Sequence, residues 1–274
     1  MNAAISLNRN FGTLASVLAF TALPLAGCSG AADEEIANAV ITSALQSDNN
    51  GEVGDVVADS PSPECENDPN VWASKAAARP QVFLNPVGCA TKTATGAALH
   101  IDFNQCTGPF GRMLLAGGVD AKFSNGSSCE AHVEVADSGN LTSNGNPLNY
   151  KASGDIRLIS GQRSTTWHSE IIGTSRRGKP LQMSSDRSVV LNEVSHCVDV
   201  MGTSTGTVGG RSFSTNIESL SVCPGKCPSA GVLRAHIDGR FRDRTLEVRF
   251  DGSKHAQVTG INGDEFTVEM QCEE

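Results

Sequence analysis

The stretch GVLRAHID, residues 231–238, decides the fold because its side chains alternate between apolar and polar. Leu233, Ala235 and Ile237 alternate with Arg234 and His236, so an extended chain places the two sets on opposite faces. TLEVRF at residues 245–250 and EFTVEMQC at residues 265–272 repeat this period of two. Such alternation is typical of β-strands with one buried and one solvated face. The C-terminal part of the chain is therefore predicted to form antiparallel sheet.

Comparable runs fill the chain from residue 87 onward. They are ALHIDFNQC, RMLLAGGVDAKF, CEAHVEVADSG, LNYKASGDIRLIS, RSTTWHSEIIGTS, KPLQMSSDRSVVLNEV, HCVDVMGTSTGTV and RSFSTNIESLSVC. The joints FRDRT, DGSK and NGDE carry the Gly, Asn and Asp residues that tight turns need. We predict an all-β antiparallel meander of about twelve or more strands, with no helix after residue 85. To bury its apolar face, such a meander has to curl into a sandwich, an open half-barrel or a small barrel.

The first 27 residues have the layout of an export signal. One positive charge, Arg9, precedes the uncharged run FGTLASVLAFTALPLAG at residues 11–27. This run is a poor membrane span, because it contains Pro24 and barely reaches the roughly 20 apolar residues that a span needs. Cys28 follows it directly.

The residues LAGC, which end at Cys28, resemble the lipobox of bacterial lipoproteins. The resemblance implies that a peptidase cleaves before Cys28, that its sulfur carries diacylglycerol and that its amine is acylated, for example with palmitate. Several acyl chains, at about 0.8 kcal/mol per buried methylene, make a durable anchor. In such proteins Ser29 at the next position implies the outer membrane. The expected location is thus the cell envelope, with the membrane bound through Cys28.

An acidic segment follows the lipobox. Residues 31–70 contain no lysine or arginine and ten acids: Asp33, Glu34, Glu35, Asp48, Glu52, Asp55, Asp59, Glu64, Glu66 and Asp68. The part AADEEIANAVITSALQS at residues 31–47 is predicted to form a short helix with acids at its N-terminus. The remainder has the composition of a flexible tether. From residue 71 onward the twenty acids and twenty bases balance, so all the net negative charge lies next to the anchor and nucleic acid is excluded as a partner.

Eight cysteines remain after Cys28, and an exported chain is expected to pair them. They are Cys65, Cys89, Cys106, Cys129, Cys197, Cys223, Cys227 and Cys272. The strand order suggests the pairs Cys89–Cys106, Cys197–Cys223 and Cys227–Cys272, which leave Cys65–Cys129 by elimination. CPGKC at residues 223–227 lacks a second matching pair, so no metal and no cofactor is predicted.

A second resemblance covers most of residues 85–272. CTGPFG at residues 106–111, GGRSF at 209–213, and the later FDGS and VTG are similar to an uncharacterised family of predicted lipoproteins from myxobacteria. The resemblance implies no activity. Cys65 and Cys129 depart from the cysteine set of that family.

Three patterns have the form of reactive or binding sites. GTSTG at residues 202–206 fits the serine hydrolase pattern, but strand and turn surround Ser204 and no helix follows, so we interpret it as part of a hairpin. HID occurs at residues 100–102 and 236–238, where alternation places both charged side chains on a solvated strand face. Arg240, Arg242 and Arg244 straddle a turn and are expected to be exposed. Trp167 is predicted to lie in the core, and no catalytic residue is assigned.

The sequence therefore predicts a signal at residues 1–27, a tether at 28–70 and a disulfide-linked β domain at 71–274. The leading hypothesis is a non-enzymatic envelope lipoprotein that binds a protein partner or has a structural role. The first alternative is a carrier that folds a curved sheet around a lipid or another apolar ligand. The second is a hydrolase that uses Ser204 or an HID pair.

Overall fold

The computed structural model describes residues 68–78, 84–107, 114–126, 129–159, 162–175, 178–192, 195, 197–223, 226–238, 244–260, 263–270 and 272. One helix, α2 (Pro69–Ala78), precedes the strands of the described part. The strands are β1 (Ala90–Thr95), β2 (Ala98–Thr107), β3 (Leu114–Asn125), β4 (Glu130–Asp137), β5 (Thr142–Ser143), β6 (Asn146–Ile159), β7 (Gln162–Thr174), β8 (Pro180–Asn192), β9 (Val198–Val208), β10 (Arg211–Val222), β11 (Ala230–Ile237), β12 (Arg244–Phe250), β13 (His255–Thr259) and β14 (Glu265–Glu269).

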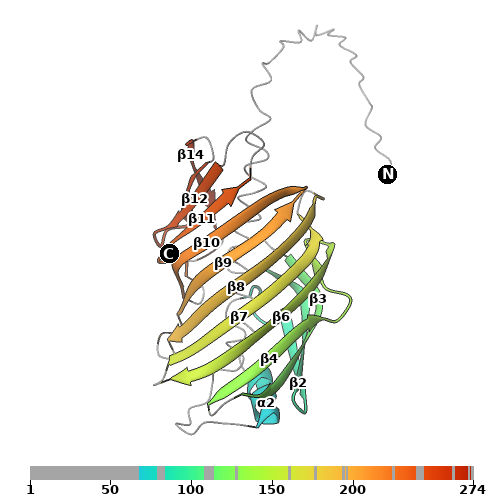
Figure 1. The fold of residues 1–274 in the computed structure, drawn as a ribbon. Helices are drawn as coiled ribbons and strands as arrows, with labels where there is room; N and C mark the ends of the chain where they lie inside the picture. Colours follow the sequence, from blue (N-terminus) through green and yellow to red (C-terminus); the bar gives the residue numbers. More distant parts are fainter. Residues whose placement is uncertain are drawn as a thin grey trace, which may run out of the picture.

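The strands form one antiparallel sheet in the order β1-β2-β3-β4-β6-β7-β8-β9-β10-β11-β12-β13-β14, so the predicted meander is confirmed. The two-residue strand β5 lies off this path and pairs with β3 and β6. Figure 1 shows the sheet curling, with β2 and β3 behind β4 and with the last strands turned away at the other end. The pairing path begins at β1 and ends at β14, so the described sheet matches an open half-barrel better than a closed barrel.

The two faces of the sheet differ in burial, and we call the buried one the inner face. Leu99, Ile101 and Phe103 of β2 are buried, while the residues between them are exposed. The same alternation runs through the later strands and joins their inner side chains into one apolar cluster. The period of two read from the sequence thus decides which face is buried.

Helix α2 packs against β1, β2 and β3 and was not predicted from the sequence. Its N-terminus is capped by Asp68, whose carboxylate accepts a hydrogen bond of 2.9 Å from the backbone of Asn70. Pro69 occupies the first helical position, where its missing N–H costs nothing. Trp72 and Ala76 are buried in the common core. The helix predicted at residues 31–47 lies outside the described residues.

A bulge in β10 interrupts the alternation of that strand. Ser219 has a φ of 49°, and the pairing of β10 with both β9 and β11 shifts at this point. The extra residue returns Leu220 to the inner face after Ile217. Gly231 lies opposite the bulge, where an added Cβ would lie 2.7 Å from the Cα of Leu220. Glycine is therefore required where the two backbones approach so closely.

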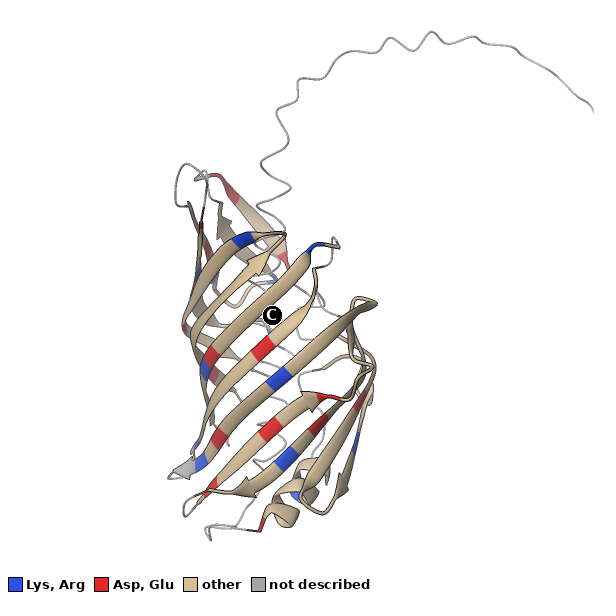
Figure 2. Ribbon diagram, turned by 45° about the vertical axis from the view of Figure 1, so that its right-hand side comes forward, with Lys and Arg blue, Asp and Glu red and all other residues tan. Residues whose placement is uncertain are grey.

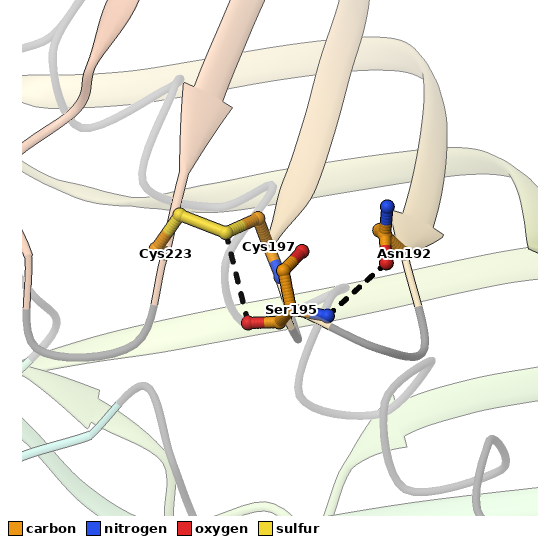
Figure 3. Close-up of a disulfide and its surroundings, with 4 residues drawn as sticks. All are labelled: Asn192, Ser195, Cys197 and Cys223. Carbon is orange, nitrogen blue, oxygen red and sulfur yellow. Dashed lines mark hydrogen bonds between the residues drawn. A yellow bond between two sulfur atoms is a disulfide. The ribbon is translucent and has the colours of Figure 1, made fainter.

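Three disulfides connect the strands, and all three match the predicted pairs: Cys89–Cys106, Cys197–Cys223 and Cys227–Cys272. Figure 3 shows Cys197–Cys223 beside the β8–β9 turn, where the backbone of Ser195 donates a hydrogen bond of 3.1 Å to the side chain of Asn192. Cys197 Sγ lies 3.7 Å from the carbonyl oxygen of Ser195, which is a van der Waals contact because a disulfide sulfur carries no hydrogen. Cys129 is also disulfide-bonded. Its predicted partner Cys65 lies outside the described residues, so that pairing stays a prediction.

Within the part of the chain described, no helix has the length and apolar character needed to span a membrane.

Of the three disulfides whose two cysteines are both described, the one that closes the longest loop should contribute most to stability. Cys227–Cys272 links residues 45 apart, and the chain-entropy estimate for that loop is about 4 kcal/mol. The double variant Cys227→Ala/Cys272→Ala should lose about this much free energy of unfolding in urea. Cys89→Ala/Cys106→Ala opens a loop of 17 residues and should lose about 3 kcal/mol. Equal stability of both variants and the parent protein would contradict this account.

Candidate functional site

The inner face is not uniformly apolar. Seven polar side chains of the described residues are buried, and all of them lie on the four adjacent strands β7 to β10. They are Arg163, Thr165, Ser169, Ser185, Arg187, Ser204 and Thr215. Buried polar groups cost free energy unless they are hydrogen-bonded, so their concentration in one region calls for a physical explanation.

The register brings most of these side chains together. Ser169, Ser185, Ser204 and Thr215 lie directly opposite one another on successive strands. In the next inner row, Trp167 lies opposite Arg187. We call these six residues the polar band: Trp167, Ser169, Ser185, Arg187, Ser204 and Thr215.

One half of the polar band is internally hydrogen-bonded. Arg187 donates from Nη2 to Ser204 Oγ at 2.6 Å, and Thr215 Oγ1 lies 3.0 Å from the same oxygen. Arg187 Nη1 also donates to the backbone carbonyl of Asp186 at 3.3 Å. Burial lowers the pKa of Arg187 to about 10, and the nearby Asp186 carboxylate opposes that shift. Arg187 therefore still carries its positive charge at neutral pH.

The other half of the polar band lacks partners. Trp167 Nε1, Ser169 Oγ and Ser185 Oγ are buried and have no hydrogen-bond partner in the structure. The exposed fractions of these residues are 2%, 1% and 3%. Leaving a buried donor or acceptor unsatisfied costs about 1–3 kcal/mol, so these three groups are expected to meet a partner in the functional protein.

The serine row of the polar band continues into small side chains on the neighbouring strands. On β6 the serine row continues to Ala152, and on β11 it continues to Ala235. We call Ala152, Ser169, Ser185, Ser204, Thr215 and Ala235 the small row. Larger apolar side chains border it on one side at Ile171, Met183 and Phe213. With strands about 4.8 Å apart, the small row is about 24 Å long.

The outer face carries cross-strand pairs of histidine and aspartate. His100 Nδ1 lies 2.7 Å from Asp120 Oδ1, so the first HID histidine pairs across strands and not with Asp102 of its own motif. His132–Asp155 and His168–Asp186 repeat the arrangement, each at 2.8 Å.

The second HID motif also lies on the outer face. His236 Nε2 lies 3.9 Å from Asp238 Oδ1. The histidine and aspartate of both motifs are exposed, as predicted. Among the described residues, no group of three or more His, Cys, Asp or Glu side chains is arranged to hold a metal ion.

Figure 2 shows basic and acidic residues interspersed along the strands, without a run of one sign. Arg234 bonds to Glu218 and, at 2.8 Å, to Glu247 on the strands at either side. Hydrogen bonds from Arg234 and then Arg249 lower the pKa of the Glu247 carboxyl. These pairs connect β10, β11 and β12 at the surface, where ion pairs contribute little.

Ser204 is placed differently from a hydrolase nucleophile. It lies within β9, is buried on the inner face, and its hydroxyl contacts Arg187 and Thr215. The imidazoles of His100, His168 and His236 are exposed on the opposite face, where His132 is half-buried. The turn of this hairpin is at Gly209 and Gly210, beyond the GTSTG motif. Of the three arginines expected to be exposed at a turn, Arg240 and Arg242 lie outside the described residues, as does the side chain of Arg244.

Comparison with known proteins identifies no relative of this chain. No protein-family model, no curated protein sequence and no solved structure matches this chain.

The sequence analysis missed the polar band, although Trp167 was predicted to be buried and is. Ser184 and Ser185 are consecutive, and alternation places one on each face, so polarity alone does not show which serine is buried. The alternation of the flanking residues could have shown which serine is buried. Met183 and Val189 define the inner face of β8. Ser185 and Arg187 lie an even number of residues from Met183, so they share that face.

The two kinds of buried serine should respond differently to substitution. Ser204→Ala removes an acceptor that Arg187 and Thr215 use, so the refolded variant should lose about 1–3 kcal/mol of unfolding free energy. Ser185→Ala removes a hydroxyl without a partner, so its stability should stay equal or rise. Urea unfolding of both refolded variants measures the difference, and a matching loss in the two would show that Ser185 is hydrogen-bonded after all.

Proposed function

We propose that this chain is a lipid-anchored protein of the cell envelope whose β domain is a non-enzymatic binding module. The polar band is the centre of its ligand face. The observation that carries this proposal is the set of three buried polar groups without partners on the inner face, Trp167 Nε1, Ser169 Oγ and Ser185 Oγ.

A purely structural role does not account for this arrangement. Alanine or valine at the positions of Ser169 and Ser185 would fit the apolar face without an unsatisfied group, and neighbouring strands use such residues. Natural proteins leave buried polar groups without partners mainly at functional sites. The polar band therefore favours binding over a scaffold function.

The burial of these groups favours a small ligand over a protein partner. The groups that need partners are at most 3% exposed, whereas a protein surface docks on exposed side chains. Side chains available to a protein partner, such as Ile172 and Met201, lie singly on the outer face. This observation raises the carrier hypothesis above the protein-partner hypothesis.

The proposed anchor rests on the LAGC sequence and the uncharged run before it. A tether with ten acids would extend by self-repulsion and hold the β domain away from the lipid surface.

Fractionation of cells that express the full chain tests this function. Cys28→Ser should move the protein from the membrane fraction to the soluble fraction, because the acyl chains supply the anchor. Ser29→Ala is the matched control and should stay membrane-bound. Native mass spectrometry of the released Cys28→Ser protein should then show an added non-protein mass. Retention of Cys28→Ser on the membrane would contradict the anchor, and a bare protein mass would contradict the binding role.

A further inference from the structure

We infer that the inner face binds a long-chain carboxylate, with the head group at the β7–β8 half of the polar band and the acyl chain along the small row toward β12. This inference rests on the proposed binding role and names the chemical class of the ligand. Three features support it: the hydrogen-bonding needs of the head position, the charge beside it and the apolar path that leads away from it.

The head position requires oxygen acceptors. Trp167 Nε1 can only donate a hydrogen bond, and Ser169 and Ser185, which face each other across β7 and β8, can each donate one more. A carboxylate offers two oxygens and about four acceptor sites, so one such group can satisfy all three donors. An aliphatic molecule without oxygen would leave them unsatisfied.

The neighbouring charge selects an anionic head. Arg187 lies opposite Trp167 and one inner position along β8 from Ser185. Its guanidinium is buried and charged at neutral pH, and charged hydrogen-bond partners in a poorly solvated site interact strongly. A carboxylate is therefore favoured over a neutral ester with the same chain.

The path away from the head is apolar. Ser204 Oγ accepts hydrogen bonds from Arg187 and Thr215, so these two hydroxyls already have partners and do not need a ligand. Beyond them the small row reaches Ala235 on β11 and then Leu246 on β12, both fully buried.

The bordering rows along this path are also apolar. Phe213 and Ile237 line one side of it, and Ile217 and Leu233 line the other. From β8 to β12 the path is about 19 Å long, comparable with the roughly 15 Å of one acyl layer in a bilayer.

Trp167 makes the test site-specific, because the chain has only two tryptophans. The full-length Trp72→Phe variant keeps Trp167 as its single indole. Titration with 9,10-dibromostearate below its micellar concentration should quench more than half of the Trp167 fluorescence, and unlabelled stearate should reverse the quenching. The matched Trp167→Phe variant retains Trp72 on α2 and should be quenched much less.

Head-group variants test the contacts. Ser169→Ala/Ser185→Ala should weaken stearate binding at least tenfold, whereas Ser184→Ala/Ser188→Ala, on the outer face of the same sheet, should leave it unchanged. Methyl stearate should bind at least tenfold more weakly than stearate. Retention of Cys89–Cys106, Cys197–Cys223 and Cys227–Cys272, shown by peptide mass analysis without reduction, confirms that each variant is folded.

Any of four results would overturn the inference. Equal quenching of Trp167 and Trp72, or unchanged binding in Ser169→Ala/Ser185→Ala, would place the fatty acid elsewhere. If native mass spectrometry shows a bound molecule of another class while stearate fails to bind, the ligand assignment fails and the binding role stands. If neither stearate nor any co-purified molecule is bound, both the inference and the proposed function fail.

Discussion

A single sheet in which each strand pairs mainly with the next one along the chain has to bury one face over its whole length. Apart from β5, all the described strands follow this path, and the alternation of apolar and polar residues keeps one face buried from β2 to β13. A shift of one residue in any strand would turn its apolar side chains to water. The bulge at Ser219 shows how the constraint is met, because the extra residue restores Leu220 to the inner face.

The polar band is a local departure from this constraint. It occupies inner positions on β7 to β10, where the pattern calls for apolar side chains, and half of it is satisfied within the protein. The unsatisfied half, Trp167, Ser169 and Ser185, adjoins the charged Arg187. A fold that depends on burying one face tolerates few such exceptions, which is why we assign the binding role to this part of the sheet and not to the solvated outer face.

The meander and the disulfides could be predicted from the sequence because they depend on the local residue pattern and the strand order. The polar band could not, because it depends on the pairing register between strands. Alternation predicted the meander, and the strand order predicted three disulfides, because consecutive antiparallel strands bring cysteines at their ends together. Helix α2 was missed although Asp68 and Pro69 are a helix-start signal, because these two residues were interpreted as the end of the tether. The polar band was missed because its members are far apart in sequence and become neighbours only when four strands align. The lipid anchor and the helix at residues 31–47 lie outside the described residues and stay predictions.

The central claim is that the unpartnered groups of the polar band contact a bound ligand. A crystal structure of the full-length Cys28→Ser protein, purified under native conditions without unfolding, tests it most directly. The account predicts non-protein density within hydrogen-bonding distance of Trp167 Nε1 and Ser185 Oγ, continuing past Thr215 toward Leu246. Ordered waters alone at these groups, or side chains of the protein itself bonded to them, would contradict it.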